Sequence, residues 1–327
     1  MLHKTGNSQR VRSRIVRAIV SLATLAVAVS IGLAGGPLAH AQSAEAYPAK
    51  PIRLIVGFPP GQATDVAARI YAEQLGARLG QPVVVENRPG QGGSMALAYL
   101  KNMPADGYTI GLMATASLAT NPHLYKSVGY DPLKDFEAVS IIAEGPLVLV
   151  AHPRLPVATT QELIAYARER PGKLNYCSPG NGTLSHLAME DLKARAGISL
   201  THVPYQGSVK AMADLVGGNV DVCFDTFTVV KAYLDSGRLK ALGVATPQRL
   251  DSLPNVPGIS ESGIDGFVAI PYIGIVAPSG TPRAVINRLY TELAAIQGST
   301  EMRKRLLAVL GAPPVLTTPA EFEMRIR

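Results

Sequence analysis

Strand and helix patterns alternate along this chain from Tyr47 onward, and that alternation limits the fold more than any other feature of the sequence. The apolar run at 51–58 predicts a strand, and a helix with one apolar face follows over 64–79. Further strands are predicted at 82–86, 108–113, 140–151 (with a break at 145–146), 174–178, 199–203, 220–224, 239–245 and 272–277. Further helices are predicted at 159–170, 183–195, 208–216 and 226–236. Because strands that alternate with helices form mainly parallel sheets covered by helices, the predicted class is α/β.

The chain has 327 residues, which is long for one ordinary domain and suits two α/β lobes. The sequence contains no low-complexity linker and no tandem repeat. We therefore expect the two lobes to be joined by several crossings of the chain.

The first 41 residues have the pattern of a signal peptide. A basic stretch precedes the apolar run 18–34, and the small-residue triplet Ala39-His40-Ala41 follows it. We predict cleavage after Ala41 and a mature protein in the periplasm. An uncleaved membrane anchor is the alternative, although the apolar run is short for a span. No cysteine follows the triplet and no Arg-Arg pair precedes the run, which argues against a lipoprotein and against the twin-arginine route.

The net charge of +7 does not indicate a nucleic-acid partner. Five of the basic residues lie in the predicted signal peptide, which has no acidic residue, and the remainder carries about +2. The chain has 6 Phe, 12 Tyr and no Trp, so an aromatic-lined basic surface is not expected.

Five strand-to-helix turns are rich in glycine or serine, at 58–65, 87–94, 114–117, 177–183 and 204–208. Unpaired N–H groups at a helix N-terminus point outward and the helix dipole adds positive charge, so such turns favour an anion. In open α/β sheets a ligand lies at the carboxyl ends of the strands. The alternative is that they are ordinary tight turns, which every α/β protein needs.

Enzyme and cofactor motifs are missing from the sequence. It contains no H-E-x-x-H, no G-x-S-x-G and no phosphate-binding G-x-x-x-x-G-K-[ST]. The stretch 180–185 is a near miss to the dinucleotide motif, with Ser185 in place of the third glycine. His123, His152, His186 and His202 show no metal-ligand spacing, so we predict neither a metal nor a cofactor.

Four further side chains carry open alternatives. His186 is expected to cap or pack in the first turn of its helix, although it would lie near a cleft. Asp225, at a strand end, would bind an amine or hydroxyl of a ligand, anchor the fourth turn, or cap the helix that follows. Cys177 and Cys223 would either form a disulfide in an oxidising compartment or be two small buried residues.

Several motifs, in order, resemble the solute receptors of tripartite tricarboxylate transporters, which are also called TctC or Bug-type receptors. They are Y-P-x-K-P-I-R-L-I-V-G-F-P-P-G at 47–61 followed by T-D-V-A-A-R, E-N-R-P-G-Q-G-G at 86–93, P-A-D-G-Y-T at 104–109, N-P-H-L-Y at 121–125, N-Y-C-S-P-G-N-G-T at 175–183, V-P-Y-Q-G at 203–207 and D-L-V-G-G-N-V-D-V-C-F-D ending at Asp225. The match covers essentially the whole predicted mature chain.

The resemblance implies a type II periplasmic-binding-protein fold, in which two α/β lobes close on a ligand in the cleft between them. Lobe 1 would comprise 42–146 and 268–327, and lobe 2 would comprise 147–267. It also implies a small carboxylate ligand and transmembrane permease subunits as partners, and we expect a monomer. Carried onto this chain, the predicted ligand contacts are Pro60, Gly61, Gln62, Ala63, Thr64, Thr115, Ser117, Pro179, Gly180, Asn181, Gly182, Thr183, Tyr205 and Asp225.

The sequence departs from the family pattern at three places. Gln62 stands where a second glycine is usual, and Gln91 where a small residue is usual. A side chain as long as Gln62 is expected to reach into the cleft. Family members generally continue beyond Arg327, so a truncated C-terminus is expected. The predicted cleft loops offer no evident arginine clamp, and Arg88 is the nearest candidate.

The function predicted is therefore capture of a small carboxylate for delivery to a tripartite tricarboxylate-type permease, without catalysis. A ligand-sensing partner of a membrane sensor kinase is the first alternative, because both roles depend on the same lobe closure. A secreted enzyme with an unrecognised site is the second.

Overall fold

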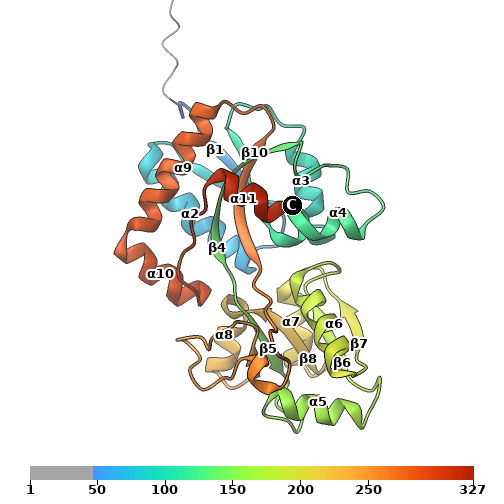
Figure 1. Ribbon diagram of the computed structural model, residues 1–327. Helices are drawn as coiled ribbons and strands as arrows, with labels where there is room; N and C mark the ends of the chain where they lie inside the picture. The colour runs from blue at the N-terminus through green and yellow to red at the C-terminus, as the bar shows by residue number, and fades with distance from the viewer. Residues whose placement is uncertain (1–46) are drawn as a thin grey trace, which may run out of the picture. The chain divides into compact units, whose positions relative to one another are not determined.

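The computed structural model describes residues 47–327, in which two five-stranded sheets form the centres of two lobes (Figure 1). The predicted signal peptide and its cleavage after Ala41 lie outside the described residues. No helix in this part of the chain combines the length and the apolar character needed to cross a bilayer.

The two sheets have the same plan. Their strand orders are β2-β1-β3-β10-β4 in lobe 1 and β7-β6-β8-β5-β9 in lobe 2. The strands of lobe 1 are β1 (Ile52–Val56), β2 (Val83–Asn87), β3 (Thr109–Ala114), β4 (Phe136–Glu144) and β10 (Tyr272–Pro278). Those of lobe 2 are β5 (Leu147–Ala151), β6 (Asn175–Ser178), β7 (Thr201–Pro204), β8 (Val222–Thr226) and β9 (Lys240–Val244). The predicted two-lobe α/β class is confirmed.

One strand in each sheet runs against its neighbours. β10 pairs antiparallel with β3 and β4, and β5 pairs antiparallel with β8 and β9, whereas β1, β2 and β3, like β6, β7 and β8, pair in parallel. The sheets are therefore mixed rather than purely parallel. The reversed strands are the ones that the chain enters on arriving from the other lobe, β5 after Gly145-Pro146 and β10 after Pro271.

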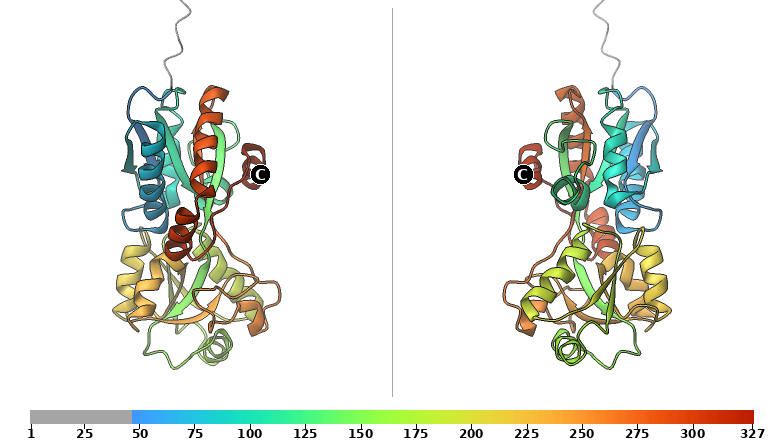
Figure 2. Two further views of the ribbon diagram at one scale, coloured as in Figure 1. Left: turned by 90° about the vertical axis from the view of Figure 1, so that its left-hand side faces the viewer. Right: turned by 90° about the vertical axis from the view of Figure 1, so that its right-hand side faces the viewer.

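Helices cover both faces of each sheet (Figures 1 and 2). In lobe 1, α2 (Ala63–Leu79), α9 (Arg283–Gly298) and α10 (Thr300–Leu310) bury one face, and α3 (Ser94–Leu100) and α11 (Pro319–Ile326) bury the other. In lobe 2, α5 (Thr160–Arg168) and α6 (Leu184–Ala196) lie on one face, and α7 (Ser208–Val216) and α8 (Phe227–Asp235) on the other. Short helical turns occupy Gln91–Gly93, Ala116–Thr120, α4 (Asn121–Leu124) and Ile259–Ser262.

The helix ends follow their local capping residues. The Thr159 hydroxyl accepts a hydrogen bond from the Glu162 N–H, and this begins α5 where the sequence predicts it. At α11 both halves of a capping box form between Thr318 and Glu321. The turns at 87–94 and 114–117 predicted helix starts where α3 and the helical turns before and in α4 lie, whereas α10 had no predicted counterpart.

The two cysteines are neighbours but are not joined. Cys177 on β6 and Cys223 on β8 are register partners, and both are buried free thiols. The Cys223 Sγ lies 3.0 Å from the Cys177 carbonyl oxygen, and burial raises the pKa of its thiol. The structure therefore favours the second alternative, two small buried residues, because both thiols are free and each lies against a main-chain carbonyl.

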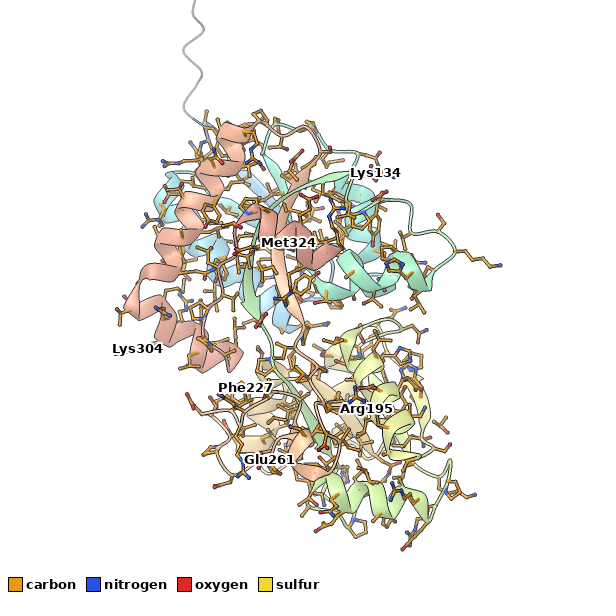
Figure 3. The ribbon with its side chains drawn as sticks, viewed as in Figure 1. Lys134, Arg195, Phe227, Glu261, Lys304 and Met324 are labelled. Atoms are coloured by element: carbon orange, nitrogen blue, oxygen red, sulfur yellow. The ribbon has the colours of Figure 1, made fainter. Side chains whose placement is uncertain are left out.

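Phe322 fixes the last helix to the sheet of lobe 1. It is fully buried, stacks edge to face on Tyr272 at 6.0 Å, and fills the space above Gly274, where an added Cβ would lie 2.2 Å from its ring. We expect Phe322→Ala to lower the free energy of unfolding by about 3–5 kcal/mol in urea denaturation, because it removes a buried ring and leaves a cavity. Met324→Ala on the outer side of the same helix (Figure 3), where Met324 is 65% exposed, is the matched control. Equal effects of the two substitutions would contradict the docked position of α11.

Candidate functional site

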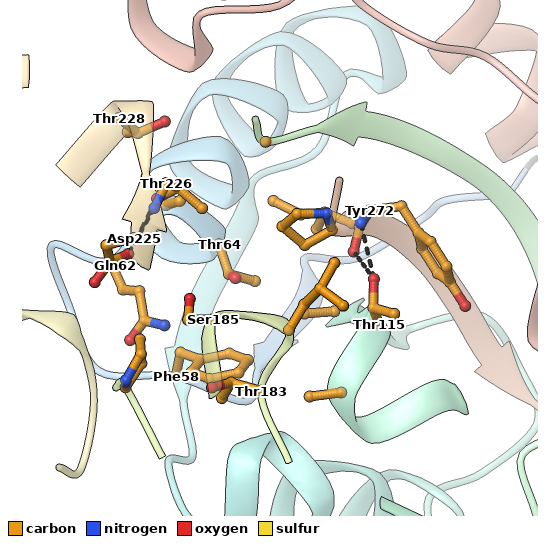
Figure 4. Close-up of a pocket in the computed structure, with 18 of the residues that line it drawn as sticks. Phe58, Gln62, Thr64, Thr115, Thr183, Ser185, Asp225, Thr226, Thr228 and Tyr272 are labelled. Carbon is orange, nitrogen blue, oxygen red and sulfur yellow. Dashed lines mark hydrogen bonds between the residues drawn. The ribbon is translucent and has the colours of Figure 1, made fainter. Parts of the chain in front are cut away.

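A cavity of about 60 Å³ lies where the strand ends of both lobes meet (Figure 4). Its wall contains residues at or just after the carboxyl ends of β1, β3, β4, β6 and β8, and residues at the amino ends of β5 and β10. One water molecule needs roughly 10–15 Å³ of such space, so the cavity has room for a small organic molecule of several heavy atoms.

Three helices begin at this cavity. Ala63 and Thr64 of α2, Leu184 and Ser185 of α6, and Thr228 of α8 all belong to its wall. Neither α2 nor α8 has a side-chain cap, whereas the Thr183 hydroxyl caps α6 by accepting from the His186 N–H. Main-chain N–H groups at the first turn of α2 are thus left to bind a ligand, and the helix dipole favours a negative charge there. At the start of α8, the Thr226 and Phe227 N–H groups already donate to Asp225 and to the Pro146 carbonyl.

The charged side chains in the cavity wall are both acidic, Asp225 and Glu144, and the wall includes no Lys or Arg of the described residues. Glu144 accepts a hydrogen bond from Arg325 at 3.1 Å, so its charge is compensated. Arg88, the expected candidate for a clamp, instead pairs with Glu86 and lies over the Tyr99 ring at 3.6 Å. An anion in this cavity would therefore rest on main-chain N–H groups and neutral side chains.

Asp225 is the most unusual side chain of the site. It is 1% exposed, and its Oδ1 accepts from the Thr226 N–H at 2.8 Å. Its Oδ2 has no hydrogen-bond partner within residues 47–327. Burial raises the pKa of this carboxyl to about 6, while Ser208 and Thr226 lower it in part. The Ser208 hydroxyl nevertheless completes no hydrogen bond, so both atoms remain unpaired.

Gln62 links the two lobes. It is 8% exposed at the N-terminus of α2, and its Oε1 accepts from the Ser208 N–H of α7 at 3.4 Å. The turn of lobe 2 at Gly207 packs closely on lobe 1 here, because a Cβ added at Gly207 would lie 3.0 Å from this oxygen and 2.9 Å from Pro59. The long side chain therefore lines the cavity from lobe 1 and caps a helix of lobe 2.

The structure divides the predicted contact residues into three groups. In the cavity wall lie Gln62, Ala63, Thr64, Thr115, Pro179, Thr183 and Asp225. In an adjoining outer groove of about 680 Å³, which shares Phe58 and Pro179 with the cavity, lie Pro60, Gly180, Asn181 and Tyr205. Outside both walls lie Gly61, Ser117 and Gly182.

The three residues outside the walls are held elsewhere for local reasons. The Gly61 N–H donates to the Asp65 carboxylate, which turns it toward α2. Ser117 is fully buried because a helical turn follows β3 directly, and its hydroxyl donates to the Ala114 carbonyl. Gly182 backs onto lobe 1, where an added Cβ would lie 2.5 Å from the Asn121 Oδ1.

Several wall residues were missed by the sequence analysis. Tyr272 and Ile273 arrive with the reversed strand β10, and Leu310 comes from α10, which the analysis did not predict. The Thr115 hydroxyl both donates to the Tyr272 carbonyl and accepts from the Tyr272 N–H, so it fixes the start of β10. Thr226 and Thr228 follow Asp225 in sequence. Two threonines directly after the strand end could have indicated further polar residues of the wall.

His186 supports the loop behind the cavity and is absent from its wall. Its Nδ1 accepts from the Gly182 N–H at 3.3 Å, and its ring stacks on His202 at 4.2 Å. The His202 ring in turn meets the Ser178 hydroxyl at 2.7 Å. The pair packs against Tyr176 and holds the turn at 178–182, which agrees with the packing role expected for His186.

Comparison with known proteins places this architecture in a family. A model of the tripartite tricarboxylate transporter family receptor matches residues 67–316. The chain is 38% identical to protein BugT of Bordetella pertussis over 92% of each chain. An R. palustris protein solved with adipate superposes with a TM-score of 0.83 at 35% identity, covering 86% of this chain and 93% of the other. MatC from Rhodopseudomonas palustris with bound malate superposes with a TM-score of 0.79 at 27% identity, covering 86% and 96%.

The raised pKa of Asp225 predicts a pH-dependent cost to the ligand-free protein. The folded state holds this proton up to about pH 6, whereas the unfolded chain releases it near 3.8, so stability falls as the pH rises through that window. We expect Asp225→Asn to raise the free energy of unfolding by about 2 kcal/mol at pH 7.5 and to change it little at pH 4. Urea denaturation at both pH values measures the difference. Asp235→Asn, an exposed change of the same charge on α8, is the control, and equal gains at both pH values would contradict the prediction.

Proposed function

Because this chain belongs to the tripartite tricarboxylate transporter receptor family, we propose that it is a periplasmic receptor that captures a small carboxylate between its two lobes and delivers it to a transmembrane permease of that transporter type. The proposed role is binding without turnover. The predicted signal peptide, with cleavage after Ala41, is the proposed means of export.

One observation carries the carboxylate proposal: the uncapped N-terminus of α2 opens into a cavity whose wall has no basic side chain among the described residues. Main-chain N–H groups fit the two oxygens of a carboxylate and favour its charge without a cation. The related structures solved with adipate and with malate hold ligands of this class. We propose that Gln62, Thr64, Thr183 and Asp225 line the ligand, with Ala63, Thr115 and Pro179 completing the wall.

A thermal-shift series with matched acids and amides tests this function. Sodium butyrate, succinate, malate and adipate would be compared with butyramide and succinamide at pH 7.5. We expect at least one acid to raise the melting temperature, since ligand at a hundred times its Kd adds about 2.7 kcal/mol to stability, and we expect the amides to have a much smaller effect. Equal stabilisation by acids and amides, or no stabilisation by any acid, would contradict the carboxylate proposal.

Gly182 offers a test of capture between the lobes. Its φ of +78° and its contact with Asn121 and Leu124 of lobe 1 leave no room for a side chain when the lobes meet. We expect Gly182→Ala to weaken binding of the acid found above by at least tenfold, because the added methyl group holds the lobes apart. Calorimetric titration measures this loss.

Gly197→Ala is the matched control for the backbone strain. Gly197 has a φ of +63° at the end of α6, with nothing within 4 Å of an added Cβ. It should lose stability like Gly182→Ala but keep the wild-type affinity. A similar loss of affinity in both variants would mean that strain in lobe 2, and not contact between lobes, explains the effect.

A further inference from the structure

The lobe 2 wall of the cavity contains buried polar atoms without partners. Within residues 47–327 they are the Asp225 Oδ2 and the Thr228 Oγ1, and the Ser208 Oγ of α7, which lies outside the wall, is unpaired as well. Asp225 and Ser208 are 1% and 0% exposed, so water does not compensate them as it would at a surface. Buried polar groups in folded proteins are almost always hydrogen-bonded, and an unpaired carboxylate oxygen is among the most costly exceptions. Such a group in a binding cavity points to a ligand that completes it.

The position of Asp225 separates two ends of the cavity. In Figure 4, Asp225 and Gln62 lie together at one side, Thr115 and Tyr272 lie at the other, and Thr64 and Ser185 lie between them. The first turn of α2, where a carboxylate is favoured, thus stands beside the Asp225 end, whereas α8 begins at that end with the N–H groups of Thr226 and Phe227 already bonded to Asp225 and to the Pro146 carbonyl. A bound acid of a few carbons would place its far end next to Asp225.

No positively charged group within residues 47–327 pairs with this carboxyl. The elements that pack around it present Gln62 from α2, Ser208 from α7, Thr226 from the start of α8 and the buried thiol of Cys223 from β8, all of them uncharged. Its pKa of about 6 leaves it ionised at pH 7.5. A second carboxylate of a ligand would meet a like charge here, whereas a donor would meet a free acceptor.

We propose that the Asp225 end of the cavity binds a hydrogen-bond donor of the ligand, so that the solute is a small acid carrying a hydroxyl or amino group besides its carboxylate. This inference rests on the proposed receptor function and narrows its ligand class. The ligand's hydroxyl or amino group donates a hydrogen bond to the Asp225 Oδ2. The unpaired Thr228 hydroxyl lies in the same wall and offers a second polar contact. Selection against plain dicarboxylates follows from the same charge.

Calorimetric titration with matched four-carbon acids tests the inference at pH 7.5. The ligands are butyrate, its 2-, 3- and 4-hydroxy and amino derivatives, and succinate. We expect at least one donor-bearing acid to bind the wild-type protein at least tenfold more tightly than both butyrate and succinate. In Asp225→Asn, we expect the preference for that acid over succinate to fall at least tenfold, because the variant has lost the like charge and gained an amide donor.

Asp235→Asn serves as the control, since it removes the same charge at the exposed end of α8 and should keep the wild-type ranking. A stable fold of Asp225→Asn is checked by its thermal unfolding. If wild-type protein prefers butyrate or succinate, or if Asp225→Asn weakens all acids equally, the inference is overturned while the receptor function stands. If no acid binds the wild-type protein, the receptor function falls and the inference falls with it.

Discussion

The chain passes between the lobes at Gly145-Pro146 and again before Tyr272, and this double crossing determines the direction of every strand that reaches the site. A strand that enters a sheet from the other lobe must start at the junction, so β5 and β10 begin there and run away from it. The strands that pair beside them, β3, β4 and β8, run the opposite way and end there. Helices that follow β1, β6 and β8 therefore begin at the same place, which brings three N-termini to one cavity.

This arrangement substitutes main-chain dipoles for basic side chains. A lysine or arginine inside so small a cavity would have to be desolvated before any ligand arrived, at a cost that grows with burial. The N–H groups of a first turn are fixed by the helix and carry only partial charge, so they remain when the cavity is empty. Gln62 applies the same principle between the lobes, because its neutral amide accepts from the first N–H of α7 and adds no charge to the wall.

The sequence was informative wherever the site depends on local structure. A turn that follows a strand and precedes a helix is a short-range pattern, so the turn at 58–65 and the strand end at Asp225 could be singled out from it, and residues 62–64 and Asp225 lie in the cavity wall. Tyr272 and Leu310 were not, because Tyr272 reaches the cavity by a long-range crossing and Leu310 comes from α10, for which no helix was predicted. The family resemblance likewise assigned whole loops to the ligand, while the structure separates them: Thr183 faces the cavity, and Gly182 faces Asn121 of the other lobe.

Asp225 shows why a binding site is not optimised for the stability of the empty protein. Its carboxyl would be satisfied by a lysine or an extra donor in the wall, and either change would occupy the space and charge that a ligand needs. An unpaired acceptor lowers the stability of the ligand-free fold, but the same free energy is recovered when a donor arrives, which widens the difference between ligands that carry a donor and ligands that do not. Ser208 and Thr226 lower the pKa of this carboxyl in part, and so they moderate the cost of its burial without cancelling it. A site of this kind discriminates between ligands through the buried acceptor that it leaves unpaired.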